Sequence, residues 1–278
     1  MIAIVTGATA GIGWHTARAL TDAGVEVLIT GRNTDRGVRA AREIGAQFHQ
    51  VDHASIADNL ALAEWISGRG RKVGMLVNNV GGAVVAERTV TAEGNELGLA
   101  LNYLGPVTLT RALLPTLAPD VHVVNVVSSS YTMYTCDPFT EPDRYVGINA
   151  HARAKQLHLL ASMSLARRLG DPSRVNAVNP GMAWTPGTQA LTPAAVPAWR
   201  FIWPLVRAFQ RRASADKAAR SSIEWALHPT GTGIYVESNG RAQPLPKRLT
   251  DPGLQDRAWQ WPQTYHATGT SPPACPAG

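Results

Sequence analysis

The sequence predicts a single α/β domain built on a doubly wound parallel sheet of about seven strands. Two observations predict this fold: short apolar segments alternate with longer helical patterns, and the first apolar segment runs directly into a glycine-rich turn. Strands that are joined through helices are parallel, because each helix has to cross back over the sheet. We assign residues 1–266 to this domain and residues 267–278, rich in Gly, Pro, Ser and Thr, to a disordered tail.

Composition narrows the class of protein. A chain of 278 residues with 45% hydrophobic content can bury a full core. The net charge of +6 would suit a polyanion, but the basic residues are scattered, which argues against a nucleic-acid partner. Cys136 and Cys275 have no metal-ligand spacing, so no metal site is expected. The first strand begins at residue 2 and no apolar run reaches ~18 residues, so we expect a cytoplasmic protein without a signal peptide or membrane span.

The first turn predicts an anion site. Residues 2–5 form a short apolar strand, TGATAGIG follows at residues 6–13, and residues 14–23 have a helical pattern. The backbone N–H groups and the dipole at a helix N-terminus attract a pyrophosphate, and glycine lets the backbone approach it closely. The turn residues expected to contact a dinucleotide are Gly7, Thr9, Ala10, Gly11, Ile12 and Gly13.

The next two strands bear on the choice of dinucleotide. Residues 25–30 form the second strand, and Gly31 and Arg32 follow it. A carboxylate here would bind the adenine ribose and repel a 2′-phosphate, whereas a cation favours the phosphate. We therefore expect NADP(H) as the cofactor, with NAD less favoured. Residues 47–51 form the third strand, and Asp52 at its end is placed to meet the adenine.

The middle of the chain adds two strands and two long helices. Residues 75–78 form the fourth strand and lead into Asn79, Val80 and Gly81. A long helix is predicted over residues 91–117, with Asn102 in its interior although asparagine is a poor helix former. The remaining elements are a strand at 122–127 ending at three serines, a helix at 145–169 containing Lys155, a strand at 174–178 closed by Asn179, Pro180 and Gly181, a helix at 216–227 and a strand at 233–236.

Between the last strands, residues 182–213 lose the regular pattern and are rich in Pro, Trp and Arg. The segment could be an amphipathic piece lying on a membrane surface. A lid over the substrate is the preferred interpretation, because the segment leaves the sheet on the cofactor side. Its aromatic residues favour a bulky, apolar substrate. These residues are Trp184, Trp199, Phe201 and Trp203.

Together these motifs resemble the short-chain dehydrogenase/reductase family, and most of all its retinol-dehydrogenase-like and WW-domain-oxidoreductase-like branch. TGATAGIG resembles the family's cofactor turn, NNVG stands where NNAG is usual, and GIYVESNGRAQPLPKRLTDPGLQDRAWQW resembles the C-terminal segment of that branch. The resemblance covers about residues 1–266 and implies a Rossmann-type fold. NPGMAWT resembles the segment that touches the nicotinamide, which implies cofactor contacts for Pro180, Gly181 and Thr185.

The resemblance also implies catalytic positions. Asn102 falls at the family's active-site asparagine, and Ser129 is the best match for its serine. The family's Tyr-x-x-x-Lys pair has two possible registers here: Tyr145 with Asn149, or a histidine followed four residues later by Lys155. The flanking sequences RYVGINAHARAK and KQLHLLASMSLARRL both favour the second register. His151 therefore occupies the tyrosine position.

In the family, the tyrosine moves a proton to or from the substrate oxygen, while the lysine binds the ribose. Imidazole can also donate a proton, with an ordinary pKa of ~6.5 against ~10 for tyrosine. Beside Lys155 its charged form is disfavoured, so His151 could act as a neutral hydrogen-bond donor or as a base. The imidazole ring is also shorter than a phenol and reaches less far.

Three functions follow from this substitution. The first is an NADP-dependent oxidoreductase acting on a bulky apolar carbonyl or alcohol, with His151 or a recruited tyrosine (Tyr103, Tyr131 or Tyr134) as proton donor. The second is a non-redox enzyme, such as a cyclase, isomerase or dehydratase, with His151 as acid or base. The third is a catalytically silent binding protein. The intact cofactor turn, Asn102, Ser129 and Lys155 argue against the third, and the presence of every hydride-side feature favours the first over the second.

Two further expectations concern context. Lysine occurs only at positions 72, 155, 217 and 247, whereas arginine and alanine are abundant, which suggests a bacterial source and a role in secondary metabolism. The resemblance implies a homodimer or homotetramer that assembles through the two long helices, and a small-molecule substrate.

Overall fold

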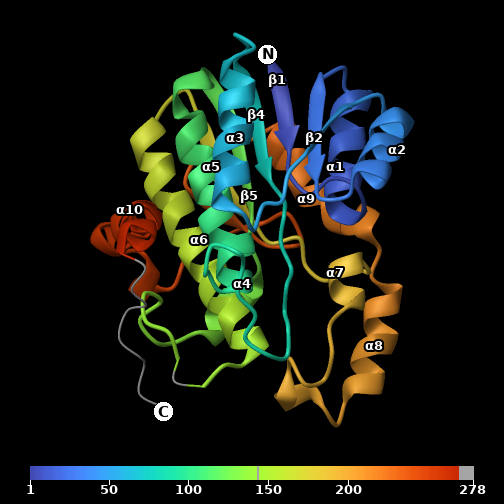
Figure 1. Cartoon of the computed structure of the whole chain (residues 1–278), viewed down its shortest axis with the longest axis vertical. Coiled ribbons are helices and arrows are strands. Elements are labelled where there is room, and N and C mark those ends of the chain that lie inside the picture. The colour runs from blue at the N-terminus through green and yellow to red at the C-terminus, as the bar shows by residue number, and fades with distance from the viewer. Residues whose placement is uncertain (143, 269–278) are drawn as a thin grey trace.

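The computed structural model describes residues 1–142 and 144–268, which form one α/β domain (Figure 1). Within these residues the sheet has eight strands in the order β3-β2-β1-β4-β5-β6-β7-β8. All neighbouring strands are parallel except β7 and β8. The predicted doubly wound fold is confirmed. The eighth strand, which the sequence analysis did not predict, comprises only Ala242–Gln243 and is too short for a sequence pattern.

The first half of the chain forms one side of the sheet and its centre. Strand order reverses between β1 and β4, because β2 and β3 lie on one side of β1 and all later strands lie on the other. The carboxyl ends of β1 and β4 therefore flank the position where such sheets bind ligands. The elements of this half are β1 (Ile2–Val5), α1 (Gly11–Asp22), β2 (Val27–Gly31), α2 (Thr34–Ile44), β3 (Gln47–Gln50), α3 (Ile56–Ser67) and β4 (Val73–Asn78).

The predicted helix over residues 91–117 is wrong. The Glu96 carboxylate instead accepts hydrogen bonds from the N–H groups of Gly98 and Leu99, and it starts a helix there. One turn of α-helix, α4 (Leu97–Leu99), leads into a π-helical turn at Ala100–Leu104 and then into α5 (Gly105–Leu113). A 3₁₀ turn follows at Leu114–Thr116, so that β5 (Leu117–Val126) begins five residues earlier than expected.

The second half of the chain completes the sheet and covers it. Its long helix α6 (Gly147–Leu169) begins two residues after the expected position, and β6 (Arg174–Val178) has the expected bounds. The other elements are α7 (Pro186–Gln189), α8 (Trp203–Arg212), α9 (Ala215–Leu227), β7 (Ile234–Val236), β8 and α10 (Pro252–Thr268). The first two residues of the predicted disordered tail, 267 and 268, thus belong to α10, and its remainder lies outside the described residues.

Two apolar layers hold helices on the two faces of the sheet. One layer joins the sheet to α3, α5, α6 and α10, and the other joins it to α1, α2 and α9 (Figure 1). No helix among the described residues is long and apolar enough to cross a membrane.

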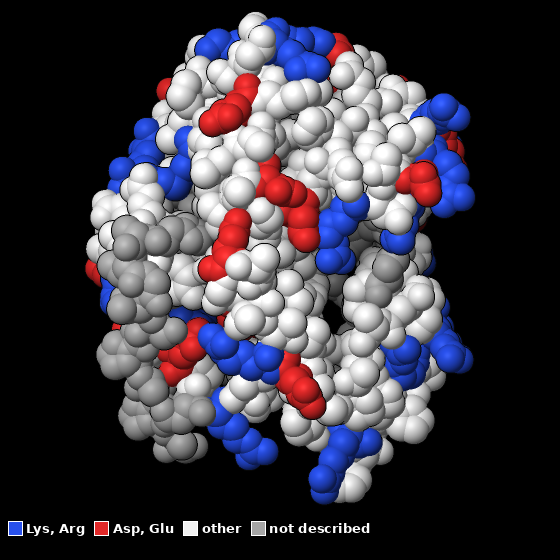
Figure 2. Space-filling view, viewed as in Figure 1, with Lys and Arg blue, Asp and Glu red and all other residues white. Residues whose placement is uncertain are grey.

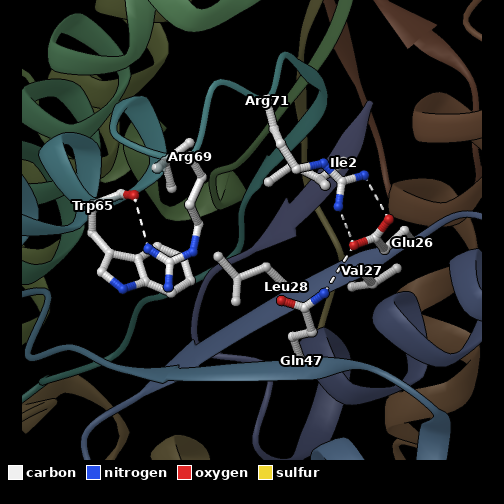
Figure 3. Close-up of a pocket in the computed structure, with 9 residues that line it drawn as sticks. Ile2, Glu26, Val27, Leu28, Gln47, Trp65, Arg69 and Arg71 are labelled. Atoms are coloured by element: carbon white, nitrogen blue, oxygen red, sulfur yellow. Dashed lines mark hydrogen bonds and ion pairs between the residues drawn. The ribbon is translucent and has the colours of Figure 1, made fainter.

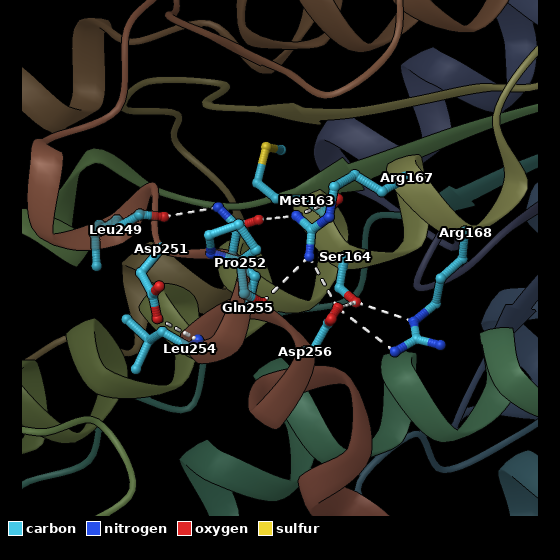
Figure 4. A network of polar contacts seen from close by, with 10 residues as sticks. All are labelled: Met163, Ser164, Arg167, Arg168, Leu249, Asp251, Pro252, Leu254, Gln255 and Asp256. Atoms are coloured by element: carbon cyan, nitrogen blue, oxygen red, sulfur yellow. Dashed lines mark hydrogen bonds and ion pairs between the residues drawn. The ribbon is translucent and has the colours of Figure 1, made fainter.

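The C-terminal helix α10 is fastened across α6. The Asp256 carboxylate accepts a hydrogen bond from Ser164 Oγ and pairs with Arg167 and Arg168 (Figure 4). Tyr103 Oη donates to the Ala258 carbonyl at 2.6 Å. A helix of the same chain therefore packs on α6, which is one of the two helices through which assembly was expected.

Candidate active site

A cleft of about 360 Å³ lies beyond the carboxyl ends of β1, β4, β5 and β6. It collects residues from the turns that follow these strands and from α6 and α7, and Figure 2 shows the surface hollowed on the side of α7. Most of the residues predicted to bind the cofactor or substrate line it. These are Gly7, Thr9, Ala10, Gly11, Ile12, Gly13, Asn79, Val80, Gly81, His151, Lys155, Pro180, Gly181 and Thr185.

The turn before α1 is built for a close anionic ligand. Ala10 at the N-cap position supplies no side-chain cap, so the first N–H groups of α1 stay open toward the cleft. A Cβ at Gly13 would lie 2.3 Å from Asn79 Nδ2, so only glycine fits there. That amide in turn donates to the Thr6 carbonyl at 2.8 Å and fixes the turn against β4. The residues present therefore fit the pyrophosphate of a dinucleotide.

The arginine that lines the cleft is not the predicted one. Arg32 is exposed and does not line the cleft, whereas Arg36, one helical turn later on α2, does. Arg32 lies before α2, whereas Arg36 lies in its first turn, beyond the strand end on which the sequence prediction was based. Gly31 before them is packed tightly, because a Cβ there would lie 2.6 Å from Thr9 Cγ2. The structure therefore leaves no room for a carboxylate at position 31.

Asp52 was predicted to meet the adenine, but it does not line the cleft. Its carboxylate accepts from the Ala54 N–H at 3.0 Å, and its own N–H donates to Asp58 Oδ2 at 2.9 Å. Asp52 therefore shapes the turn between β3 and α3.

His151 and Lys155 face the cleft from one side of α6. Lys155 Nζ donates to the Val126 carbonyl at 2.8 Å, and burial lowers the pKa of this amine to about 7. Burial, and then the charge of Lys155, lower the pKa of His151 to about 3, while the Gly82 backbone opposes this shift. His151 Nδ1 is enclosed and has no hydrogen-bond partner among the described residues. His151 is therefore a neutral imidazole near pH 7.

Tyr145, the alternative catalytic position, lies before α6 and does not line the cleft. Its hydroxyl donates to Glu96 Oε1 at 3.4 Å, and burial together with this carboxylate raises its pKa. The other candidate tyrosines are also engaged elsewhere: Tyr103 with Ala258, Tyr131 with Tyr235, and Tyr134 with Thr140. Among the described residues, no tyrosine lines the cleft.

The serine in the cleft is Ser128. Ser129 was the predicted residue, but it is exposed and does not line the cleft. Strand β5 ends at Val126, one residue earlier than expected, which brings the first of the three serines to the edge of the sheet. The Ser128 hydroxyl accepts from the Ser130 N–H at 3.2 Å.

Asn102 acts on the cleft through a loop. It is fully buried in the π-helical turn, where its amide donates to the carbonyls of Gly98 and Gly82, both at 2.8 Å. Its Oδ1 accepts from the Gly82 N–H at 3.1 Å. A Cβ at Gly81 would lie 3.0 Å from this oxygen and 3.1 Å from Lys155 Nζ. Asn102 therefore holds the loop at residues 81–82 against Lys155.

Within residues 182–213, α7 and its flanks reach the cleft through Thr185, Gly187, Thr188 and Leu191. The four aromatic residues proposed to favour a bulky substrate do not line the cleft. Phe201 is 80% exposed, and Trp184 lies under the guanidinium of Arg207. The apolar walls come instead from Val84, Val126, Val127 and Leu191, none of which the sequence analysis had singled out.

A second hollow, of about 240 Å³, lies at the opposite end of the sheet (Figure 3). Its polar groups satisfy one another: Arg71 donates two hydrogen bonds to the Glu26 carboxylate, Gln47 donates a third, and Arg69 stacks on Trp65. It holds none of the predicted site residues.

The fold and the cleft define a dinucleotide-dependent enzyme of the doubly wound α/β class. The chain belongs to the short-chain dehydrogenase family, whose family model matches residues 1–195. It is accordingly an NAD(P)-dependent oxidoreductase of that family.

Its relatives include proteins with the names of oxidoreductases. The chain is 34% identical to polyprenol dehydrogenase of Danio rerio, over 93% of this chain and 84% of the relative. It is 29% identical to a Streptomyces protein that carries the name of a daunorubicin C-13 ketoreductase, over 92% of this chain and 89% of the relative. A protein of Mycobacterium paratuberculosis has a similar structure, with a TM-score of 0.75 and 26% identity, over 98% of this chain and 94% of that one.

Proposed function

We propose that this protein is an NADP-dependent oxidoreductase that interconverts a bulky apolar carbonyl compound and its alcohol. One observation carries the proposal: His151 and Lys155 face the cleft that also contains the glycine-rich turn. A protein that only binds a dinucleotide has no need for two titratable groups at this place. The ketoreductase and polyprenol dehydrogenase names among its relatives support carbonyl or alcohol chemistry.

The choice of NADP is supported by charge near the adenosine end of the cleft. Arg36 lines the cleft, Arg32 stands exposed one turn before it, and position 31 is a tightly packed glycine. Two cations, with no carboxylate at position 31 or 32, suit a 2′-phosphate, which needs charge-assisted hydrogen bonds.

The residues of the cleft have separate roles in the proposed reaction. When bound, the nicotinamide supplies or accepts the hydride. The Ser128 hydroxyl and a ring N–H of His151 hold the substrate oxygen as charge develops on it. A neutral imidazole can give a proton from one nitrogen and take one at the other. His151 can therefore relay a proton without first becoming a charged imidazolium. Lys155, with a pKa of about 7, lies one turn further along α6, and its amine is held by the Val126 carbonyl.

The substrate class follows from the walls of the cleft. Val84, Val126, Val127 and Leu191 offer apolar surface beside the few polar groups described above. We therefore propose a substrate whose carbonyl or hydroxyl carries a bulky apolar body, and a role in bacterial secondary metabolism. The cytoplasmic location and the homodimer or homotetramer expected from the sequence belong to the same proposal.

A non-redox reaction on the same scaffold is the second candidate. It is favoured by the absence of a cleft-lining tyrosine among the described residues and by the low pKa of His151, which keeps this ring available as a base. In that reaction His151 would take a proton from the substrate, and NADP would be structural or absent.

NADPH consumption against a panel of bulky ketones and aldehydes separates the two. Wild type and His151→Tyr are compared, with Tyr145→Phe as a control outside the cleft. Turnover by wild type and by Tyr145→Phe supports the proposed oxidoreductase. Turnover by His151→Tyr alone would show that the native residue serves other chemistry, which is the non-redox candidate. If none of the three proteins consumes NADPH, the result counts against the proposed oxidoreductase for every substrate class in the panel.

A further inference from the structure

Helix α8 presents an apolar surface to solvent. Phe201 and Ile202, immediately before it, are 80% and 51% exposed, and Leu205 and Phe209 within it are 71% and 64% exposed. Leu205 and Phe209 are four apart and so share one face of α8, and Phe201 and Ile202 lie in the turn just before it. We call these four residues the α8 apolar face. Isolated exposed apolar residues need no explanation, but four within nine positions mark an interaction surface.

Helix α8 turns two polar side chains toward the protein while large apolar ones stay exposed. Gln210 is only 2% exposed and lies on the protein side. Arg207 also turns inward, because its guanidinium donates to the carbonyls of Thr188 and Gln189 at 2.9 and 3.0 Å. A soluble surface helix buries its apolar stripe and exposes its polar one. Here Gln210 and Arg207 share the protein side with the half-buried Trp203 and Val206, and the contacts of Arg207 hold this side inward, so Leu205 and Phe209 stay exposed.

The rim of the α8 apolar face carries charge of one sign. Arg200, Arg211 and Arg212 are exposed around it, and no Asp or Glu occurs from residue 172 to residue 215. Within the described part of the chain, none of these three arginines has an ion-pair partner. Figure 2 shows basic and no acidic side chains over the part of this face of the molecule that Figure 1 assigns to α8.

We propose that the α8 apolar face docks the protein onto an anionic lipid bilayer. Aromatic and leucine side chains with arginines beside them are what an interfacial helix needs, because the former enter the boundary of the acyl chains and the latter bind lipid phosphates. A second copy of the chain fits less well, since a twofold contact would bring the arginines of one copy against those of the other. Closure of α8 over its own cleft is opposed by the inward anchors of Arg207.

Docking at this place has a consequence for substrate entry. The carbonyls that Arg207 holds belong to Thr188, which lines the cleft, and to the residue after it. The apolar face therefore lies one element away from the cleft wall. On the proposed function, a membrane-dissolved carbonyl or alcohol lipid would pass from the bilayer to the cleft beside α7. This step rests on the proposed oxidoreductase, whereas the docking itself does not.

The test is co-sedimentation of the full-length protein, without cofactor, with phosphatidylcholine vesicles that contain 0 or ~30 mol% phosphatidylglycerol. Leu205→Ser/Phe209→Ser removes the apolar contact, and Arg200→Gln/Arg211→Gln/Arg212→Gln removes the charge. Leu60→Ser, at a 44% exposed leucine on α3, is the matched control. We expect wild type and Leu60→Ser to bind the anionic vesicles, and the double serine variant to bind at least about tenfold more weakly.

The other outcomes are equally decisive. Binding by the arginine variant should fall and lose its dependence on salt. Equal binding by wild type and the double serine variant would overturn the proposal, as would no binding by wild type. A wild-type dimer in solution that becomes a monomer on Leu205→Ser/Phe209→Ser would assign the face to a second copy of the chain. Because these readouts need neither cofactor nor substrate, they are independent of the proposed redox activity.

Discussion

His151 and Lys155 face the same cleft from successive turns of α6, and the Lys155 amine is held 2.8 Å from the Val126 carbonyl. The two side chains share one buried environment, in which burial and the lysine charge both favour a neutral imidazole. The charge of this pair is thus carried by the lysine, whose pKa of about 7 lets it gain or lose a proton near neutrality. Two of the predictions below follow from this division.

Lys155 should make the free energy of unfolding depend on pH between about 7 and 10.5. Its pKa falls from an ordinary 10.5 to about 7 on folding, so between these values the unfolded chain holds a proton that the folded protein does not. Stability contributed by this group is therefore complete above pH 10.5 and is lost as pH falls to about 7. Lys155→Met removes the titration. Its free energy of unfolding minus that of wild type should shrink between pH 7 and 10, as measured by urea unfolding without cofactor.

A constant difference between the two proteins over that range would show that Lys155 titrates alike in both states. Lys247→Met is the matched control, since Lys247 is an exposed lysine at the start of a 3₁₀ turn. It should leave the pH dependence of wild type unchanged.

His151 should remain neutral well below the usual pKa of histidine. With a pKa of about 3, the ring binds no proton in the folded protein at pH 5, whereas the unfolded chain is largely protonated there. Stability from this group is thus lost as pH falls from about 6.5 to 3. In ¹⁵N spectra of labelled protein, the ring signals that disappear in His151→Gln should keep neutral-imidazole shifts from pH 7.5 to 5. A midpoint near 6.5 would contradict the proposed relay, because the ring would then be an ordinary acid.

Asn102 should matter through the loop that it holds. Asn102→Ala leaves the carbonyls of Gly82 and Gly98 without their amide donor in a buried place, which should lower the free energy of unfolding by about 2–4 kcal/mol. The loop at residues 81–82 lines the cleft, so the KM for NADPH should rise as well. The control is Asn149→Ala, at a half-buried asparagine on α6, which should change neither quantity appreciably. Lost stability with an unchanged KM would confine Asn102 to a structural role.

Local signals predicted the parts of the fold that depend on one segment at a time. Two strands were predicted with their observed bounds, at residues 2–5 and 174–178. Each contains β-branched residues and runs directly into a glycine- or proline-containing turn. The cleft residues of the first turn were predictable for the same reason. The contact with Asn79 is what requires glycine at position 13, but the requirement is visible in the sequence as the glycine spacing of the turn.

The features that the sequence did not predict arise from contacts between distant residues. The helix expected over residues 91–117 is interrupted because Glu96 caps its own helix and Asn102 bonds both to the Gly98 carbonyl and to a loop twenty residues away. The shift from Ser129 to Ser128 follows from the end of β5, a boundary that local propensity does not fix. The exposure of Leu205 and Phe209 on α8 likewise depends on the contacts of Arg207 with Thr188 and Gln189.

Arg36 should decide between the two dinucleotides. It lines the cleft from the first turn of α2, whereas Arg32 is exposed outside it, so Arg36 is the cation expected to meet a 2′-phosphate. Arg36→Ala should raise the KM for NADPH by roughly tenfold, as expected for the loss of one charge-assisted contact, and leave the KM for NADH unchanged. Arg32→Ala should have a smaller effect.

Initial rates with both cofactors check this, with Arg39→Ala as the control because Arg39 is exposed on the same helix and does not line the cleft. The informative quantity is the change in the KM for NADPH relative to the change in the KM for NADH. A general loss of dinucleotide affinity would raise both KM values together, which would mean that Arg36 holds the pyrophosphate or the fold of the turn. A large effect of Arg32→Ala with none from Arg36→Ala would place the phosphate beyond the cleft wall, next to the exposed residue that the sequence first indicated.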